Sequence, residues 1–188
     1  DHIGSGHKLP LLLDAVFWTP HDLGSSTGTV MNVVLIGYRG TGKSTVAERL
    51  SEKTKMPWVD ADAALETLAG SSIKNIFSER GESAFRDLET TVLTDLIKRD
   101  EWILALGGGV ILRPENRHTL TQTSPVFWLT AEVETIRSRL SQDPNTKQRR
   151  PKLTPGGGVD EIRELLEQRA PFYQQCADHT VATDEKTA

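Results

Sequence analysis

One glycine-rich stretch constrains the fold of this chain more than any other. Residues 37–45 read GYRGTGKST and match the phosphate-binding loop pattern G-x-x-x-x-G-K-S/T. Residues 33–36 before it are apolar and mostly β-branched, which predicts a buried strand, and residues 45–53 after it have the spacing of an amphipathic helix. In this order, backbone N–H groups and a helix N-terminus face one point that favours an anionic phosphate. The alternative, a chance match in a glycine-rich turn, is disfavoured by both flanks.

The residue types within this loop suit a nucleotide and its metal ion. Gly40 and Gly42 lack Cβ atoms where the backbone must approach phosphate oxygens. Lys43 can reach the outer phosphates, and the Ser44 hydroxyl can ligate Mg²⁺. We therefore expect an ATP site formed by Gly40, Thr41, Gly42, Lys43, Ser44 and Thr45.

Composition limits the class of protein. The 188 residues suit one domain, and a hydrophobic content of 37% with 26% charged residues excludes disordered and membrane-embedded chains. A net charge of −4 shows no basic excess for nucleic acid. The single cysteine, Cys176, excludes an intrachain disulfide and fits a reducing cytoplasm, and we interpret it as structural. We expect a cytoplasmic monomer with neither a nucleic-acid nor a membrane partner.

Strands and helices alternate after an N-terminal extension. Residues 1–30 lack periodicity and end in a Gly/Ser-rich linker, so we expect them to lie outside one domain of residues 31–188; Met31 suits a natural start. The predicted strands are residues 33–36, 58–62, 102–106, 126–129 and 180–183. The predicted helices are residues 45–53, 72–80 (with Gly81 just past the end), 82–99, 113–121, 132–140 and 159–172, the last kinked or ended near Pro171. Residues 63–68 are predicted to form a helical turn. This alternation predicts a three-layer α/β/α fold with a parallel sheet, whose ligands bind at the carboxyl ends of its strands.

The second predicted strand ends in two acids. In an extended chain, the i, i+2 spacing of Asp60 and Asp62 points both side chains the same way. One can lie near Mg²⁺ through water, and the other can orient a substrate hydroxyl or accept its proton. The alternatives are an exposed loop pair or an N-cap of the following helix. Beside a phosphate loop, the functional interpretation is favoured.

Further candidate residues follow other elements. Gly107, Gly108 and Gly109 end a buried strand and suit a row of backbone donors facing a ligand, although a flexible turn is the ordinary interpretation. Arg86 and Arg169 could clamp a carboxylate, with Glu89 three residues on holding Arg86. The ordinary interpretation of each is a solvated arginine or an ion pair. Within residues 142–158, Arg150 and a glycine-rich end suit a mobile lid that closes over ATP, with a disordered surface loop as the alternative.

Taken together, these motifs resemble the shikimate kinase family. The match covers residues 32–184 and comprises the phosphate loop, Asp60-x-Asp62, Phe85-Arg86-x-x-Glu89, the triple glycine, Arg150-Pro151 and Arg169-Ala170-Pro171-x-Tyr173. The resemblance implies a P-loop kinase that transfers the γ-phosphoryl group of ATP to the 3-hydroxyl of shikimate. It also implies that Asp62, Arg86, Gly108 and Arg169 bind shikimate, that Lys43 and Arg150 act on the phosphates, and that Ser44 with Asp60 through water holds Mg²⁺. We expect Lys43, Asp62 and Arg150 to be catalytic.

The chain also departs from the family pattern. Lys152-Leu153 follow Pro151 where the family has two leucines, and the segment before it is longer than in short members. The adenine-stacking arginine is therefore unassigned, with Arg137 and Arg139 as candidates. The chain stops soon after its last predicted strand, where family members usually carry a further helix, so we expect the adenine pocket and part of the core to be incomplete. Another small-molecule kinase such as a gluconate kinase, or a nucleotide-binding module without turnover, is the alternative function.

Overall fold

The computed structural model describes residues 31–123, 125–142 and 158–184. Its elements, in chain order, are β1 (Val33–Ile36), α2 (Lys43–Thr54), β2 (Trp58–Asp60), α3 (Ala61–Ala69), α4 (Ile73–Leu96), β3 (Ile103–Ala105), the 3₁₀ turn η2 (Val110–Leu112), α5 (Pro114–Thr121), β4 (Val126–Thr130), α6 (Val133–Gln142), α8 (Val159–Cys176) and β5 (His179–Ala182). Residues 1–30 and 143–157 lie outside the described residues, so the predicted extension and most of the predicted lid, including Arg150, stay predictions.

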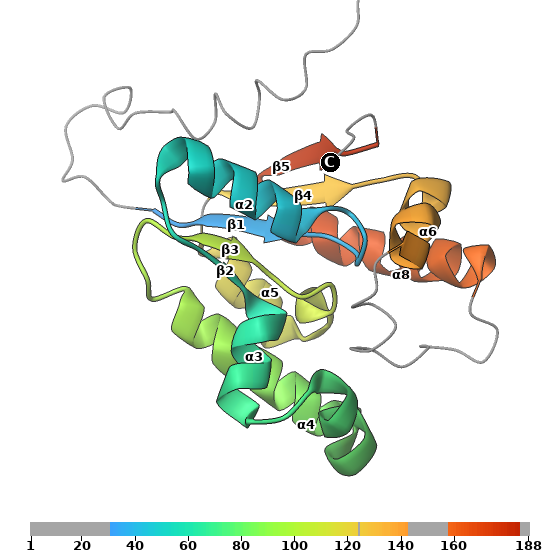
Figure 1. The fold of residues 1–188 in the computed structure, drawn as a ribbon, viewed down its shortest axis with the longest axis horizontal. Coiled ribbons are helices and arrows are strands. Elements are labelled where there is room, and N and C mark those ends of the chain that lie inside the picture. Colours follow the sequence, from blue (N-terminus) through green and yellow to red (C-terminus); the bar gives the residue numbers. More distant parts are fainter. Residues whose placement is uncertain (1–30, 124, 143–157, 185–188) are drawn as a thin grey trace, which may run out of the picture.

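The strands form one parallel sheet in the order β2-β3-β1-β4-β5. Every arrow in Figure 1 points the same way, and the loops after β1 and β4 gather at the end to which the arrows point. The central strand β1 pairs with β3 on one side and with β4 on the other. The order reverses at β1, and a crevice at the carboxyl ends beside such a reversal is where ligands bind in open α/β sheets.

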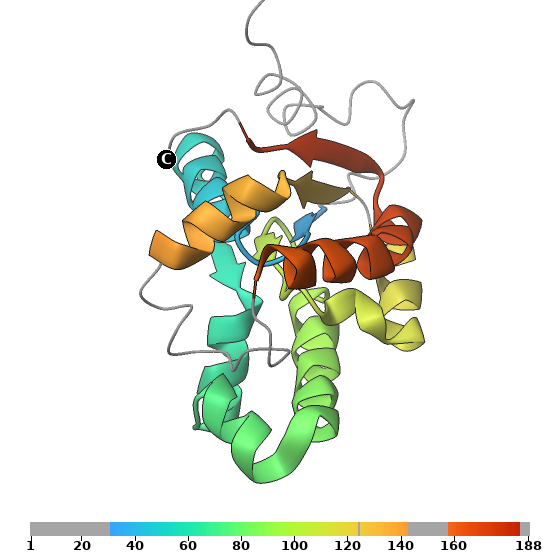
Figure 2. The ribbon, with the colours of Figure 1, turned by 90° about the vertical axis from the view of Figure 1, so that its right-hand side faces the viewer.

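Helices cover both faces of this sheet, as the alternation of elements predicts. Along β1, Val34 and Ile36 join a large apolar cluster with residues of α3, α4, α5 and α8. Val33 and Leu35 point to the opposite face and pack with Ala47 and Leu50 of α2. Figure 2 shows α2 on one side of the sheet and α5 with α8 on the other. The α/β/α prediction is confirmed.

Some element boundaries differ from the prediction in ways that matter for the site. The second strand ends at Asp60, and Asp62 lies in the first turn of α3, because the Asp60 carboxylate caps that helix. The prediction of two aspartates on one extended strand is therefore wrong. Helix α2 begins at Lys43 rather than Thr45, and α8 continues past Pro171 to Cys176.

Gly81 separates two helical segments within α4. Its φ of 78° and ψ of 175° are non-helical, so the chain turns sharply between residues 80 and 82. A predicted helix ending at this glycine, followed by a second helix, agrees with the kink. The kink directs the segment that carries Glu82 and Arg86 back toward the sheet (Figure 2).

No helix within the described residues is both long enough and apolar enough to span a bilayer.

Candidate active site

The phosphate loop has a fixed backbone. Gly37, with a φ of 143°, lies so close to the Leu129 carbonyl that any Cβ atom would collide with it. The Thr41 side chain is buried, and its hydroxyl donates a 2.7 Å hydrogen bond to the Tyr38 carbonyl. These contacts hold the loop in one shape between β1 and α2, which is the preorganisation that a phosphate site requires.

Lys43 and Ser44 open helix α2 directly after the loop. The Lys43 ammonium donates to the carbonyls of Gly37 and Tyr38 at 2.9 and 3.0 Å, so it lies across the loop on which phosphates would sit. The Ser44 hydroxyl donates to Asp60 Oδ2 at 2.7 Å. Asp60 Oδ1 accepts from the N–H groups of Asp62 and Ala63 at 2.9 and 3.3 Å. Asp60 therefore caps α3 and accepts from Ser44 at the same time.

This oxygen pair suits a magnesium ion. Mg²⁺ prefers oxygen ligands, keeps several waters and takes few carboxylates from the protein. A hydroxyl and a carboxylate 2.7 Å apart at the base of a phosphate loop supply such a partial ligand set. Within residues 31–123, 125–142 and 158–184, no group of three or more His, Cys, Asp or Glu side chains could hold a metal alone. Phosphate oxygens and water would have to complete the coordination.

Asp62 lies in the first turn of α3. It lines a small pocket together with Glu89 of α4 and Gly107, which follows β3. The remaining lining is apolar and consists of Ala61, Leu65, Val92, Leu93, Leu106 and Val110. The structure thus brings Asp62 close to the glycine row (Gly107, Gly108 and Gly109), as the sequence predicts. Asp62 reaches this place from a helix, however, and not from a strand.

The glycine row packs directly on the phosphate loop. A Cβ atom on Gly108 would lie 3.2 Å from the Gly37 carbonyl oxygen and 3.3 Å from the Arg39 nitrogen. A Cβ atom on Gly109 would collide with the Arg86 guanidinium. At Gly108 the close neighbours are backbone atoms of the phosphate loop, whereas at Gly109 the neighbour is the end of a flexible side chain. The row forms the boundary between the phosphate loop and the residues around Arg86.

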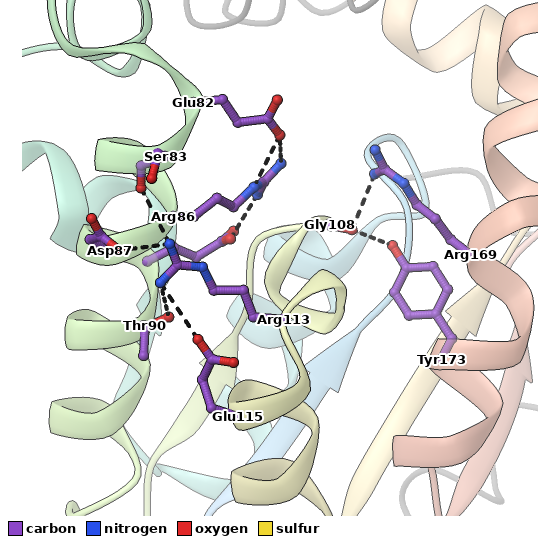
Figure 3. A network of polar contacts seen from close by, with 11 residues as sticks. Glu82, Ser83, Arg86, Asp87, Thr90, Gly108, Arg113, Glu115, Arg169 and Tyr173 are labelled. Atoms are coloured by element: carbon purple, nitrogen blue, oxygen red, sulfur yellow. Dashed lines mark hydrogen bonds and ion pairs between the residues drawn. The ribbon is translucent and has the colours of Figure 1, made fainter.

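Arg86 is held by two glutamates. Its Nη1 donates to Glu89 Oε2 at 2.7 Å, while Nε and Nη2 donate to Glu82 Oε1 at 3.3 and 3.0 Å (Figure 3). Burial by itself would lower the pKa of Arg86, but Glu89 and then Glu82 outweigh it and raise the pKa above its usual value. Three of the five N–H donors are used in these bonds, so one on Nη1 and one on Nη2 remain for a ligand.

Arg169 approaches the glycine row from the opposite side. It projects from α8, and its Nη1 lies 3.4 Å from the Gly108 carbonyl oxygen. The Tyr173 hydroxyl, one turn further along α8, donates to the same oxygen at 2.5 Å. Burial raises the pKa of Tyr173 above its usual value, with Arg169 opposing this in part, so the phenol stays a donor. Figure 3 shows Arg86 and Arg169 on either side of Gly108.

Two contacts that the sequence reasoning missed fix the surrounding helices. Arg113, just before α5, forms a 2.6 Å ion pair with Asp87 and holds α4 against α5 (Figure 3). Arg139 of α6 donates to the Gly40 carbonyl at 3.3 Å and to the Thr183 hydroxyl and carbonyl at 3.0 and 2.6 Å. No sequence pattern indicates these pairs, because their members lie 26 or more residues apart. The Glu82–Arg86 pair was also missed, although its i, i+4 spacing on a helix could have indicated it.

The two candidates for the adenine contact differ in the structure. Arg139 lies against the phosphate loop and the end of β5, whereas Arg137 is exposed and pairs with Glu134 of its own helix at 2.8 Å. Cys176 is buried, and burial raises the pKa of its thiol to about 11, which agrees with the structural interpretation.

Comparisons with known proteins agree with this arrangement. A sequence profile of the shikimate kinase family matches residues 39–188. A shikimate kinase from Rhodopirellula baltica is 40% identical over 155 residues, which cover 82% of this chain and 83% of the relative. One from Nitratidesulfovibrio vulgaris is 38% identical over 85% of this chain and 90% of the relative.

Solved structures give the same result. A shikimate kinase from Acinetobacter baumannii in complex with shikimate superimposes with a TM-score of 0.78 at 35% identity, covering 84% of this chain and 86% of that one. One from Bacteroides thetaiotaomicron superimposes with a TM-score of 0.76 at 30% identity, covering 84% and 89%. A deoxyadenosine kinase from M. mycoides with bound dATP, at 14% identity and a TM-score of 0.52 over 84% and 93%, shares the fold alone.

Proposed function

This chain belongs to the shikimate kinase family, and from that premise we propose that it transfers the γ-phosphoryl group of ATP to the 3-hydroxyl of shikimate. The products are ADP and shikimate 3-phosphate, on the route to chorismate and the aromatic amino acids. The observation that carries the proposal is the direct packing of the glycine row on the phosphate loop, with Arg86 and Arg169 on either side of that row. A donor site and a site for a small carboxylate meet there.

On the donor side, we assign Gly40, Thr41, Gly42, Lys43, Ser44 and Thr45 to ATP. The Lys43 ammonium would exchange its two carbonyl partners for phosphate oxygens and so compensate charge on the transferring group. Ser44 would ligate Mg²⁺ directly and Asp60 through water. The bound Mg²⁺ would neutralise charge on the phosphates. Arg150, outside the described residues, would add charge from the lid.

On the acceptor side, we assign the residues around the glycine row to shikimate, beginning with the N–H groups of Arg86 that its two glutamates leave available. Arg86 has one N–H on each Nη for the carboxylate of shikimate, and Arg169 faces the same row. Gly107, Gly108 and Gly109 would let the substrate approach the backbone closely. Asp62, in the first turn of α3, would orient the 3-hydroxyl of shikimate and accept its proton as the phosphoryl group is transferred in line. We propose a cytoplasmic monomer.

A coupled ADP-release assay tests this function. Shikimate, gluconate and nucleoside monophosphates are supplied as separate acceptors with MgATP. Release of ADP with shikimate alone supports the proposal. Turnover with gluconate alone, or tight ATP binding without acceptor-dependent turnover, contradicts it.

Two substitutions test the catalytic roles. Asp62→Asn removes the proton acceptor and Lys43→Met removes the phosphate cation, so each should lower kcat by at least about a hundredfold. Circular dichroism and the melting temperature should match those of the unmodified protein. A near-normal kcat in either variant would refute the role of that residue.

A further inference from the structure

The backbone carbonyls of the glycine row are all turned toward the protein. The Gly107 carbonyl accepts from the Val110 N–H at 3.1 Å, and the Gly109 carbonyl accepts from the Leu112 N–H at 3.0 Å. Both bonds are local, because they belong to the 3₁₀ turn that follows the row. The Gly108 carbonyl has no backbone partner among the described residues, so its orientation depends on side chains.

Tyr173 of α8 is the main side-chain partner of this carbonyl. It has no exposed surface, and its hydroxyl donates to the Gly108 oxygen at 2.5 Å. Its ring stacks on Trp128 of β4, which holds the hydroxyl in place. Burial raises the pKa of the phenol above its usual value, so it stays a donor. Arg169, one turn earlier on α8, reaches the same oxygen only at 3.4 Å.

The peptide between Gly108 and Gly109 needs a partner that fixes its orientation. Neither residue has a Cβ atom, so this peptide can turn over at little steric cost. A trans peptide is planar, and its N–H points away from its carbonyl. With the carbonyl at Tyr173, the Gly109 N–H faces the opposite side, where Arg86 lies (Figure 3). This N–H is buried and has no acceptor within the described residues, although buried N–H groups are almost always paired.

We propose that Tyr173 is a positioning residue for the acceptor and acts through the peptide between Gly108 and Gly109. Its hydroxyl holds this peptide with the N–H toward the acceptor and the carbonyl away from it. If the peptide turned over, a hydrogen-bond acceptor would replace a donor beside an anion. Tyr173 also keeps the carbonyl paired when Arg169 turns to the acceptor. The inference rests on the proposed function, which assigns the glycine row and Arg169 to shikimate.

Steady-state kinetics of Tyr173→Phe test the role of the hydroxyl. This variant loses the donor and keeps the ring against Trp128. A buried carbonyl that loses its partner weakens acceptor binding, so KM for shikimate should rise roughly tenfold while kcat and KM for ATP stay within about twofold. Para-aminophenylalanine at position 173 keeps a donor at the same ring position and should restore KM for shikimate.

The orientation of the peptide can be measured without turnover. A ¹⁵N-glycine label marks the 15 glycines of the chain, and the amide resonance of Gly109 is identified by its loss in Gly109→Ala. In the free protein, Tyr173→Phe should shift or split the Gly109 resonance. The resonance of Gly70, which ends α3, should stay in place. Para-aminophenylalanine at position 173 should return the Gly109 resonance to its original position.

Cys176→Ala is the matched control for packing. Cys176 is buried on α8, three residues after Tyr173. Its truncation disturbs the packing of this helix and leaves the Tyr173 hydroxyl in place. KM for shikimate and the Gly109 resonance should therefore not change. The melting temperature shows whether each variant is folded, and the para-aminophenylalanine variant, which keeps a donor, is compared directly with the unmodified protein if Tyr173→Phe does not fold.

Three results would overturn the inference. An unchanged KM for shikimate in Tyr173→Phe means that the hydroxyl does not position the acceptor. An equal rise of KM for shikimate and ATP, or a similar rise in Cys176→Ala, assigns the effect to packing. A Gly109 resonance that does not respond to Tyr173→Phe means that the peptide is held by other contacts. Failure of the proposed function is distinguishable, because the unmodified protein would then release no ADP with shikimate.

Discussion

At the scale of single residues, several side chains of the site have two duties. Asp60 caps α3 through Oδ1 and accepts from Ser44 through Oδ2. Tyr173 fills the core beside Trp128, with ring centres 5.6 Å apart, and also donates to Gly108 at the edge of the site. Such residues connect the stability of the fold to the geometry of the site, so their substitution would affect both.

Substitution of Gly109 should affect the geometry of the site without affecting the stability of the fold. Its φ is −103°, which any residue can adopt, so an alanine there would disturb only the neighbouring Arg86 guanidinium. Gly109→Ala should displace that guanidinium and raise KM for shikimate roughly tenfold. KM for ATP should not change, because Lys43 and Ser44 lie on the other side of the row. Steady-state kinetics with each substrate varied in turn would show this, and an acceptor KM within twofold of the unmodified value would contradict it.

At the scale of elements, the direction of the second half of α4 depends on the kink at Gly81. Gly81 adopts a φ of 78° and a ψ of 175°, a region that is almost restricted to glycine. No neighbouring atom would contact a Cβ atom there. Glycine is thus required at position 81 by its backbone conformation and not by lack of space. The kink directs the segment that carries Glu82 and Arg86 toward the glycine row.

Gly81→Ala should therefore lower the free energy of unfolding by about 1–3 kcal/mol and raise KM for shikimate. Gly70→Ala is the matched control. Gly70 also has a positive φ, of 61°, with no neighbour within 4 Å, but it ends α3 away from Arg86. We expect it to cost about 1 kcal/mol with an unchanged KM. Urea denaturation and kinetics on both variants give the comparison, and equal effects on KM would argue against a role for the kink.

Helix α6 also supports the phosphate loop. Arg139 joins the Gly40 carbonyl to Thr183 at the end of β5, and the buried Thr183 hydroxyl lies 3.1 Å from the Thr41 carbonyl. Three separate segments thus meet at the loop. Their contacts fix its position relative to the last strand of the sheet.

Arg139→Met should raise KM for ATP roughly tenfold, since charge-assisted hydrogen bonds to the loop and to Thr183 are lost. Arg137→Met on the same helix removes an arginine that is 59% exposed and should have no such effect. Thr183→Ser keeps the hydroxyl and should restore the affinity that Thr183→Val loses. If Arg137→Met and Arg139→Met behaved alike, the contact with the loop would not be the cause.

At the scale of the whole molecule, the buried thiol of Cys176 links stability to pH. Burial raises its pKa from 9.0 to about 11, with Arg117 opposing this in part. The unfolded chain releases the proton at the lower pH, so the unfolded state gains stability first. The stabilisation is complete below pH 9 and is lost as the pH rises toward 11.

Unfolding experiments between pH 8 and 11 should therefore show a steeper loss of stability in the unmodified protein than in Cys176→Ala. The alanine variant starts from a lower value, because a buried side chain is truncated. The thiol should also react slowly with a disulfide reagent at pH 8 in the native state and rapidly in denaturant. Parallel pH profiles for the two proteins would contradict the role of Cys176.

The sequence predicts the sheet and the position of the phosphate loop because these depend on local patterns. A buried β-branched strand, a glycine loop and an amphipathic helix specify one another over 20 residues, and β1 ends where predicted. The boundary after Asp60 was wrong because alternation in three residues cannot distinguish a strand end from an N-cap. Capping is decided by which N–H groups the carboxylate reaches.

Contacts between distant segments were not predictable in the same way. Arg113 with Asp87, and Arg139 with Thr183, join helices and strands whose distance is set by packing of the whole core. Whether the buried Nε of Arg39 finds a hydrogen-bond partner, which it does not among the residues that the structure describes, depends on what surrounds it in three dimensions. The residue types of the site could be predicted, but their partners could not.

The contact between Gly108 and the phosphate loop has a consequence for inhibitor design. A single glycine, at which even a Cβ atom would press on the loop backbone, separates the loop from the proposed acceptor residues. A nucleotide and an acceptor analogue would therefore meet without a wall of protein between them. A short tether could join the two into one bisubstrate compound, whose second half would bind at the high effective concentration that tethering creates.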